Sequence, residues 1–161
     1  MSNEVASEGM TTISVRSRQA AEMAEQLADL YCSDRLQPPI VLVGYSQGVE
    51  TCVQMAETLQ SREVEVDALI LMEGGKRFNT IPSNVRYCFN LYTSNPATDW
   101  LPLLRGLPVD GNPATTHIVN RDARHTGPAP LSRQYHLGLG WSNQARRILL
   151  DEIRMAYYPA N

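Results

Sequence analysis

The sequence lacks any apolar run long enough to cross a membrane. Its continuous apolar stretches, such as residues 40–43, are only a few residues long, whereas a membrane-spanning helix needs about 20. The start of the chain also lacks the positively charged and apolar segments of a secretory signal peptide. These absences exclude a helical membrane span and predict a cytoplasmic protein, or a secreted one if the N-terminus is truncated.

Cysteines, basic residues and phosphate-binding motifs are also few or missing. The three cysteines, Cys32, Cys52 and Cys88, cannot all pair, and no two of them have the spacing of zinc ligands. The 14 basic residues are outnumbered by 17 acidic ones and form no stripe, so nucleic-acid binding has no electrostatic basis. The phosphate-loop pattern G-x-x-x-x-G-K-[ST] is absent as well. We therefore expect free thiols, and predict no metal, no cofactor and no nucleic-acid partner.

The composition that remains is that of one globular domain. The chain has 161 residues, of which 43% are apolar and 19% charged, values typical of a single folded unit. Residues 1–12 are polar and predict a flexible leader, which leaves residues 13–161 for the domain.

Apolar residues recur in two periodicities along this domain. Helical spacing predicts three helices, at residues 18–31, 47–60 and 141–156. The last of them is expected to bury Trp141. Apolar and β-branched runs predict four strands, at residues 40–43, 66–72, 85–92 and 115–119. The alternation predicts an α/β fold with a parallel sheet of about four to five strands flanked by helices. The functional crevice is then expected at the carboxyl ends of the strands.

One motif in this pattern indicates chemistry. Gly44-Tyr45-Ser46-Gln47-Gly48 fits G-x-S-x-G and lies between a predicted buried strand and a predicted amphipathic helix. In that setting the serine occupies a sharp turn, and glycine at Gly44 and Gly48 is expected to avoid collisions on both sides of it. The backbone N–H of Gln47, at the helix N-terminus, is then placed to hold a developing oxyanion.

The motif and its flanks resemble the nucleophile elbow of the α/β-hydrolase fold, in the Gly-Tyr-Ser-Gln-Gly form favoured by cutinases and related small esterases and lipases. The resemblance runs from about residue 18 to residue 156. It implies a serine hydrolase that cleaves a carboxylic ester or thioester, with a small-molecule ester or acyl substrate. It also implies a catalytic triad in which Ser46 is the nucleophile.

A serine nucleophile needs a neighbouring base, and the chain offers three histidines. His117 lies inside a predicted strand. His125 follows the fourth strand, where the hydrolase pattern carries its base, so the resemblance assigns the role to His125. His136, in the loop before the last helix, is the alternative.

The acid that orients the histidine has three candidates. Asp99, in the loop after the strand that precedes the histidine strand, matches the usual location in the family. Glu73, directly after the second strand, is a recognised alternative location. Asp122, three residues before His125, is the third.

The sequence also departs from the hydrolase pattern. The elbow strand begins near residue 40, where the family has several earlier strands and a second oxyanion donor. The fold is therefore expected to be α/β-hydrolase-like but incomplete at the N-terminus. This leaves open a catalytically degenerate binding or assembly module, and an exposed sheet edge that favours a homo-oligomer.

Overall fold

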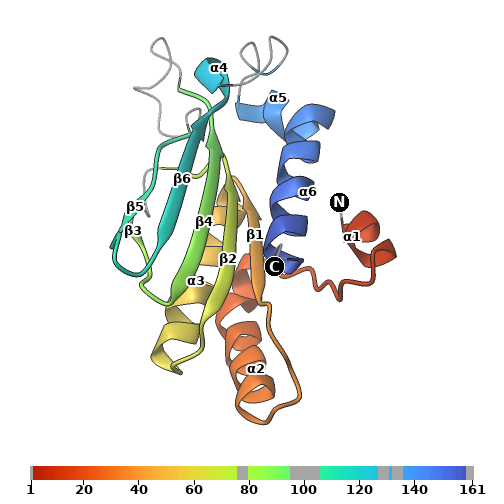
Figure 1. Cartoon of the computed structure of the whole chain (residues 1–161), viewed down its shortest axis with the longest axis vertical. Coiled ribbons are helices and arrows are strands. Elements are labelled where there is room, and N and C mark those ends of the chain that lie inside the picture. Colours follow the sequence, from red (N-terminus) through yellow and green to blue (C-terminus); the bar gives the residue numbers. More distant parts are fainter. Residues whose placement is uncertain (1, 76–79, 95–105, 127–130, 132–135, 159–161) are drawn as a thin grey trace.

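A four-stranded parallel sheet forms the centre of the protein in a computed structural model, which describes residues 2–75, 80–94, 106–126, 131 and 136–158. The strand order is β1-β2-β4-β6. These strands comprise β1 Val41–Tyr45, β2 Val66–Met72, β4 Val85–Tyr92 and β6 His117–Asp122. Every pairing between them is parallel (Figure 1). A separate parallel pair joins β3 Thr80–Ile81 to β5 Asp110–Gly111.

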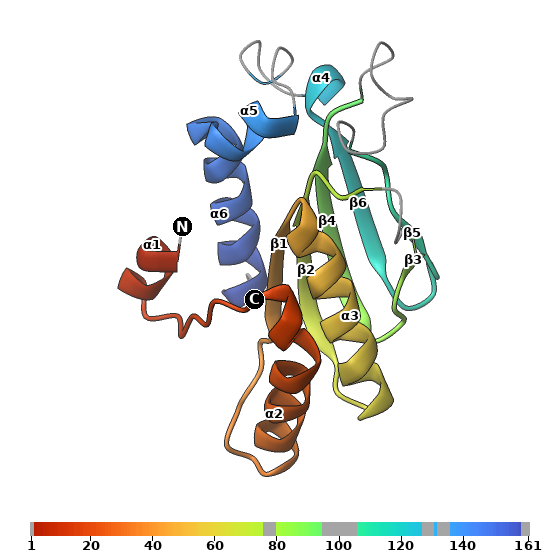
Figure 2. The same ribbon diagram turned by 180° about the vertical axis from the view of Figure 1, so that it is seen from behind.

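Helices cover both faces of the sheet. On one face lie α2 (Ala20–Cys32) and α3 (Gln47–Ser61), and on the other lies α6 (Asn143–Tyr157), as Figures 1 and 2 show from opposite sides. The shorter elements are α1 Ser2–Ser7, η1 Ser17–Gln19, α4 Ala123–Thr126 and α5 His136–Trp141. The carboxyl ends of the four strands all point toward α4 and α5, so side chains that follow different strands meet at that end (Figure 1).

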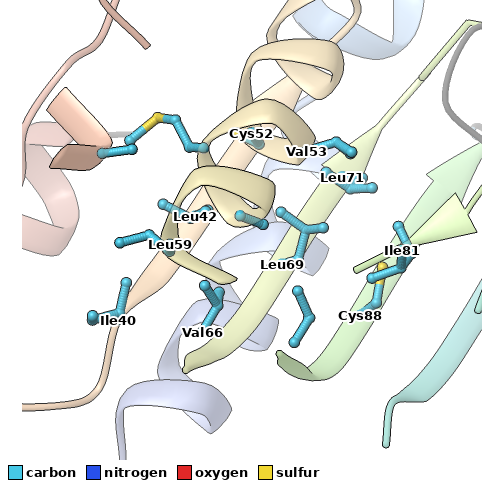
Figure 3. Packing of buried hydrophobic residues seen from close by; sticks show 14 of the residues in the cluster. Ile40, Leu42, Cys52, Val53, Leu59, Val66, Leu69, Leu71, Ile81 and Cys88 are labelled. Atoms are coloured by element: carbon cyan, nitrogen blue, oxygen red, sulfur yellow. The ribbon is translucent and has the colours of Figure 1, made fainter. Parts of the chain in front are cut away.

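Two apolar clusters fill the space between these layers. The cluster under α2 and α3 includes Leu42, Val53, Leu59 and Leu69 (Figure 3). The cluster under α6 includes Ile70, Phe89, Leu149 and Ile153. Strand β2 contributes to both clusters, because alternate side chains of a strand point to opposite faces. This explains why residues 66–72 are almost continuously apolar.

The α/β class, the parallel sheet and its flanking helices are confirmed, and the main sheet has four strands. The stretch that we predicted as a leader contains a short helix. Ser2–Ser7 form α1, and Val5 and Met10 are buried against the α6 side. Ion pairs Glu4–Arg146 and Glu8–Arg154 add to this contact.

The predicted burial of Trp141 is wrong, because 89% of this residue is exposed. Trp141 ends α5, and the hydroxyl of Ser142 then caps α6 by accepting a hydrogen bond from the Ala145 N–H. The cap shifts the start of the last helix past Trp141, which removes the tryptophan from its buried face. Within the described part of the chain, no helix is both long and apolar enough to cross a bilayer.

The three thiols are expected to react very differently. Cys52 and Cys88 are buried, and burial raises the pKa of each thiol to about 12. Cys32 is exposed. Because the thiolate is the reactive form, we expect dithiobis(nitrobenzoate) at pH 8 to modify one thiol per folded chain and all three after denaturation. Rapid modification of more than one thiol in the folded protein would contradict this burial.

Candidate functional site

Ser46 occupies a strained turn between β1 and α3. Its backbone angles are φ 53° and ψ −116°, a region that residues other than glycine rarely adopt. The Ser46 N–H donates to the carbonyl of Met72 on the neighbouring strand at 2.9 Å. The turn is therefore anchored to β2, and the serine side chain is held at the carboxyl end of the sheet.

The two glycines of the motif have different roles. A Cβ on Gly44 would lie 2.6 Å from the carbonyl oxygen of Gly48, so only glycine fits there without backbone movement. A Cβ on Gly48 would meet nothing within 4 Å. The steric role that we predicted for both glycines therefore holds for Gly44 and is wrong for Gly48.

Ser46, His136 and Glu73 form a continuous hydrogen-bonded chain. The Ser46 Oγ lies 3.1 Å from His136 Nε2, and His136 Nδ1 lies 2.8 Å from Glu73 Oε2. A carboxylate can only accept, so in the neutral imidazole Nδ1–H donates to Glu73 and Nε2 is free to accept from the Ser46 hydroxyl. The imidazole is 11% exposed and the carboxylate is fully buried, so little water competes for these bonds.

Glu73 is fixed from several directions. It directly follows β2 with φ 59°, and its N–H donates to the carbonyl of Leu91. Its second carboxylate oxygen, Oε1, accepts from the Thr93 hydroxyl at 2.7 Å. A Cβ on Gly106 would lie 3.0 Å from that oxygen and 2.6 Å from Tyr92 Cβ. The absence of a side chain at Gly106 thus allows the backbone there to lie close to the Glu73 carboxylate.

Tyr45 supports the segment that carries His136. The Tyr45 hydroxyl donates to the His136 carbonyl at 3.0 Å, and the two rings stack with centroids 5.9 Å apart. A Cβ on Gly140 would lie only 2.7 Å from the tyrosine ring, so the glycine permits this close approach. Burial and the nearby Glu73 charge raise the pKa of the phenol, which keeps the hydroxyl protonated as a donor.

The structure does not bring the first-ranked histidine to Ser46. The His125 side chain is 76% exposed, and its Nε2 lies 3.8 Å from Asp122. Asp122 also accepts from the Ser94 hydroxyl and the Arg124 N–H. His136, the alternative in our sequence analysis, takes the position beside Ser46. His117 begins β6 and stacks on Tyr87.

The acid next to this histidine is Glu73, which our sequence analysis ranked second. Asp99, the first choice, lies outside the described residues. The sequence signal that favoured Glu73 was its position directly after a strand. The structure explains why this position matters, since Tyr45 and Met72 are register partners in β1 and β2. The residue after each of these, Ser46 and Glu73, therefore leaves the sheet at the same level.

Gln47 is the first residue of α3. The first N–H groups of a helix have no acceptor within the helix, and the partial positive charge of the helix N-terminus lies at the same point. The Gln47 N–H, adjacent in sequence to Ser46, is therefore available to a negatively charged oxygen formed there.

No known family model, curated protein or solved structure was found to match this chain. The described residues contain no group of three or more His, Cys, Asp or Glu side chains arranged to hold a metal ion. The argument for function therefore rests on the geometry of Ser46, His136 and Glu73.

Thr93 is expected to position Glu73. The change Thr93→Val keeps the shape but leaves a buried carboxylate oxygen without its donor, an interaction worth about 1.5–3 kcal/mol for charged groups. We expect kcat for a reaction at the Ser46 hydroxyl to fall roughly tenfold or more, with KM nearly unchanged. Thr93→Ser, which retains the hydroxyl, should restore most of the rate. Equal losses in the two variants would argue against positioning through this bond.

Proposed function

We propose that the protein is a serine hydrolase with an α/β-hydrolase-like fold that cleaves a carboxylic ester or thioester. The single observation that carries the proposal is the chain of hydrogen bonds from Ser46 through His136 to Glu73. This arrangement matches the general design in which a base activates a hydroxyl nucleophile and a third group orients the base.

Each residue then has a defined part in the first half-reaction. His136 Nε2 accepts the hydroxyl proton as Ser46 Oγ attacks the substrate carbonyl carbon, and the carbonyl oxygen becomes an oxyanion. The Gln47 N–H donates to that oxyanion, while Glu73 stabilises the imidazolium through Nδ1–H. Collapse of the tetrahedral intermediate breaks the carbon–oxygen or carbon–sulfur bond, and the alcohol or thiol leaves with the proton from His136.

Water completes the cycle. His136 accepts a proton from a water molecule as its oxygen attacks the acyl carbonyl, which forms a second tetrahedral intermediate. His136 returns the proton to Ser46 Oγ as the acyl–serine bond breaks, and the carboxylic acid is released. His136 already lies within hydrogen-bond distance of both Ser46 and Glu73, so positioning the three side chains requires little ordering at the moment of reaction.

The proposal is tested by labelling with a fluorophosphonate, which reacts with activated serines. Wild-type protein should be labelled, and Ser46→Ala should lose all labelling together with hydrolysis of p-nitrophenyl acetate. Ser83→Ala is a matched control, because Ser83 is a hydroxyl that binds only Gln60 among the described side chains. No labelling of folded wild-type protein would refute an activated serine.

The second candidate is a binding or assembly module that retains this fold without catalysis. The position of β1 at the edge of the sheet favours this candidate. With β1 at the edge, the Gln47 N–H is the oxyanion donor that we can assign. A folded protein that neither labels nor hydrolyses esters would select this candidate.

A further inference from the structure

The His136 ring is held by few bonds. Within the described part of the chain, its Nδ1 bonds Glu73 and its Nε2 bonds the Ser46 hydroxyl. The second bond is lost once Ser46 Oγ carries an acyl group, because an ester oxygen has no proton to donate to Nε2. With one remaining bond, at Nδ1, the ring can swing, so a base that must next activate water needs a further support.

Tyr45 contacts both the backbone and the ring of His136. Its hydroxyl donates to the His136 carbonyl at 3.0 Å, and the two rings stack with an interplanar angle of 23°. Tyr45 is the last residue of β1 and directly precedes Ser46. One side chain on the strand that presents the serine therefore fixes the main chain of His136 and limits the tilt of its imidazole. Neither contact involves Ser46 Oγ, so both persist after acylation.

The phenol ring also suits the charge that His136 acquires. When Nε2 takes a proton, the imidazole becomes a cation, and the face of an aromatic ring attracts a cation within about 6 Å of its centroid. The centroids of the Tyr45 and His136 rings are 5.9 Å apart. The same stacking that limits the tilt of the imidazole therefore also stabilises the positive charge that forms on it during the reaction.

We propose that Tyr45 is a positioning residue that keeps His136 Nε2 directed at the attacking water after Ser46 has been acylated. This inference rests on the hydrolase function proposed above and goes beyond it by assigning the support of the base in the second half-reaction. In that step water adds to the acyl carbonyl and gives a proton to Nε2, and Nε2 returns the proton to Ser46 Oγ as the acyl–oxygen bond breaks. Tyr45 matters less for acylation, in which the Ser46 hydroxyl also holds the ring.

Gly140 on α5 is matched to Tyr45. A Cβ on Gly140 would lie 2.7 Å from both Cζ and Oη of the phenol, so Gly140→Ala displaces the ring that the glycine accommodates. In a Tyr45→Leu background those two atoms are absent, and the added methyl group has room. We therefore expect Gly140→Ala to slow hydrolysis of the acyl-enzyme in the wild-type background alone, a non-additivity typical of residues in direct contact.

Pre-steady-state hydrolysis of p-nitrophenyl acetate tests the proposal, because it separates acylation from deacylation. With Tyr45→Leu we expect deacylation to slow about 100-fold, the lower end of what a positioned base contributes, and acylation to slow by less than about tenfold. The intact mass should then show acetyl groups accumulating on Ser46. Tyr45→Phe keeps the stacked ring and loses one hydrogen bond, so its deacylation should slow only about two- to tenfold.

Tyr158→Phe is the matched control. It also removes a phenol hydroxyl that donates to a backbone carbonyl, that of Glu8 at 2.8 Å. Tyr158 follows the end of α6 that is remote from α5 (Figure 1), so both rates should stay as in wild type. Equal slowing of the two half-reactions by Tyr45→Leu, or unchanged deacylation, would overturn this inference.

Failure of the proposed function gives a different result from failure of this inference. A folded wild-type protein that forms no acyl-enzyme would refute the proposed function, and the inference with it. Normal acylation and deacylation in both Tyr45→Leu and Gly140→Ala would refute the inference alone. The thermal unfolding midpoint identifies a variant that fails to fold. If Tyr45→Leu is such a variant, Tyr45→Phe and Gly140→Ala decide the question, because each should slow deacylation more than acylation.

Discussion

Replacing His136 with glutamine is expected to abolish nearly all ester hydrolysis, whereas the same change at His125 should leave the rate within about twofold of wild type. Proton transfer by a positioned base typically accelerates a reaction by about 10²–10⁴-fold, and His136 is the histidine whose Nε2 lies 3.1 Å from Ser46 Oγ. His125 is 76% exposed and lies beside Asp122. Loss of its imidazole therefore removes nothing from the proposed reaction.

The paired histidine variants distinguish catalysis from folding. Glutamine preserves hydrogen-bonding capacity at both positions, so the thermal unfolding midpoint should change little for either variant. The decisive quantity is kcat/KM for p-nitrophenyl acetate, measured with fluorophosphonate labelling of Ser46. A large loss with His125→Gln and none with His136→Gln would show that the two segments exchange places when substrate binds, and would refute the site described above.

Gly44→Ala is expected to destabilise the protein by about 3 kcal/mol, the upper range for an over-packed core position. The added Cβ would lie within 2.9 Å of three backbone atoms, Gly48 C and O and Val49 N. Backbone atoms in the first turn of α3 cannot rotate away as a side chain can. The strand-to-helix turn must therefore open, which also moves Ser46 away from His136.

Gly48→Ala is the matched control, with an effect of the opposite sign. Gly48 is a residue of α3, and a Cβ added to it would meet no atom within 4 Å. Alanine is favoured over glycine in a helix by about 0.5–1 kcal/mol. Urea unfolding should move the midpoint down for Gly44→Ala and slightly up for Gly48→Ala. Similar losses in the two variants would mean that the packing of Gly44 against the helix is not what shapes the turn.

Much of the fold could be predicted from periodicity. Residues 66–72 and 85–92 were predicted as strands with the bounds that the structure shows. Residues 66–72 form a nearly continuous apolar run, as is typical of a strand whose two faces are both buried. Helix α1 was missed because a helix of six residues has too few turns to show a periodic face. Its position depends on tertiary contacts, such as burial of Val5 against α6, which a local pattern does not encode.

The candidate site was predicted in part. Ser46 was identified because the turn that presents it is a local feature, defined within five residues. His136 and Glu73 are 90 and 27 residues from Ser46, and the position of the base in the hydrolase pattern, in the loop after the fourth strand, favoured His125 instead. The fold reverses that ranking by stacking His136 on Tyr45, a contact between segments that are remote in sequence.

The placement of Glu73 beside Ser46 separates the site into a fixed half and an adjustable half. Both residues leave adjacent strands at one register level, and the Ser46 N–H binds the residue before Glu73. The serine and the acid therefore share one rigid frame, whereas His136 arrives on α5, outside the sheet. Sequence changes within α5 can therefore alter the surroundings of the imidazole while the serine–acid spacing stays constant.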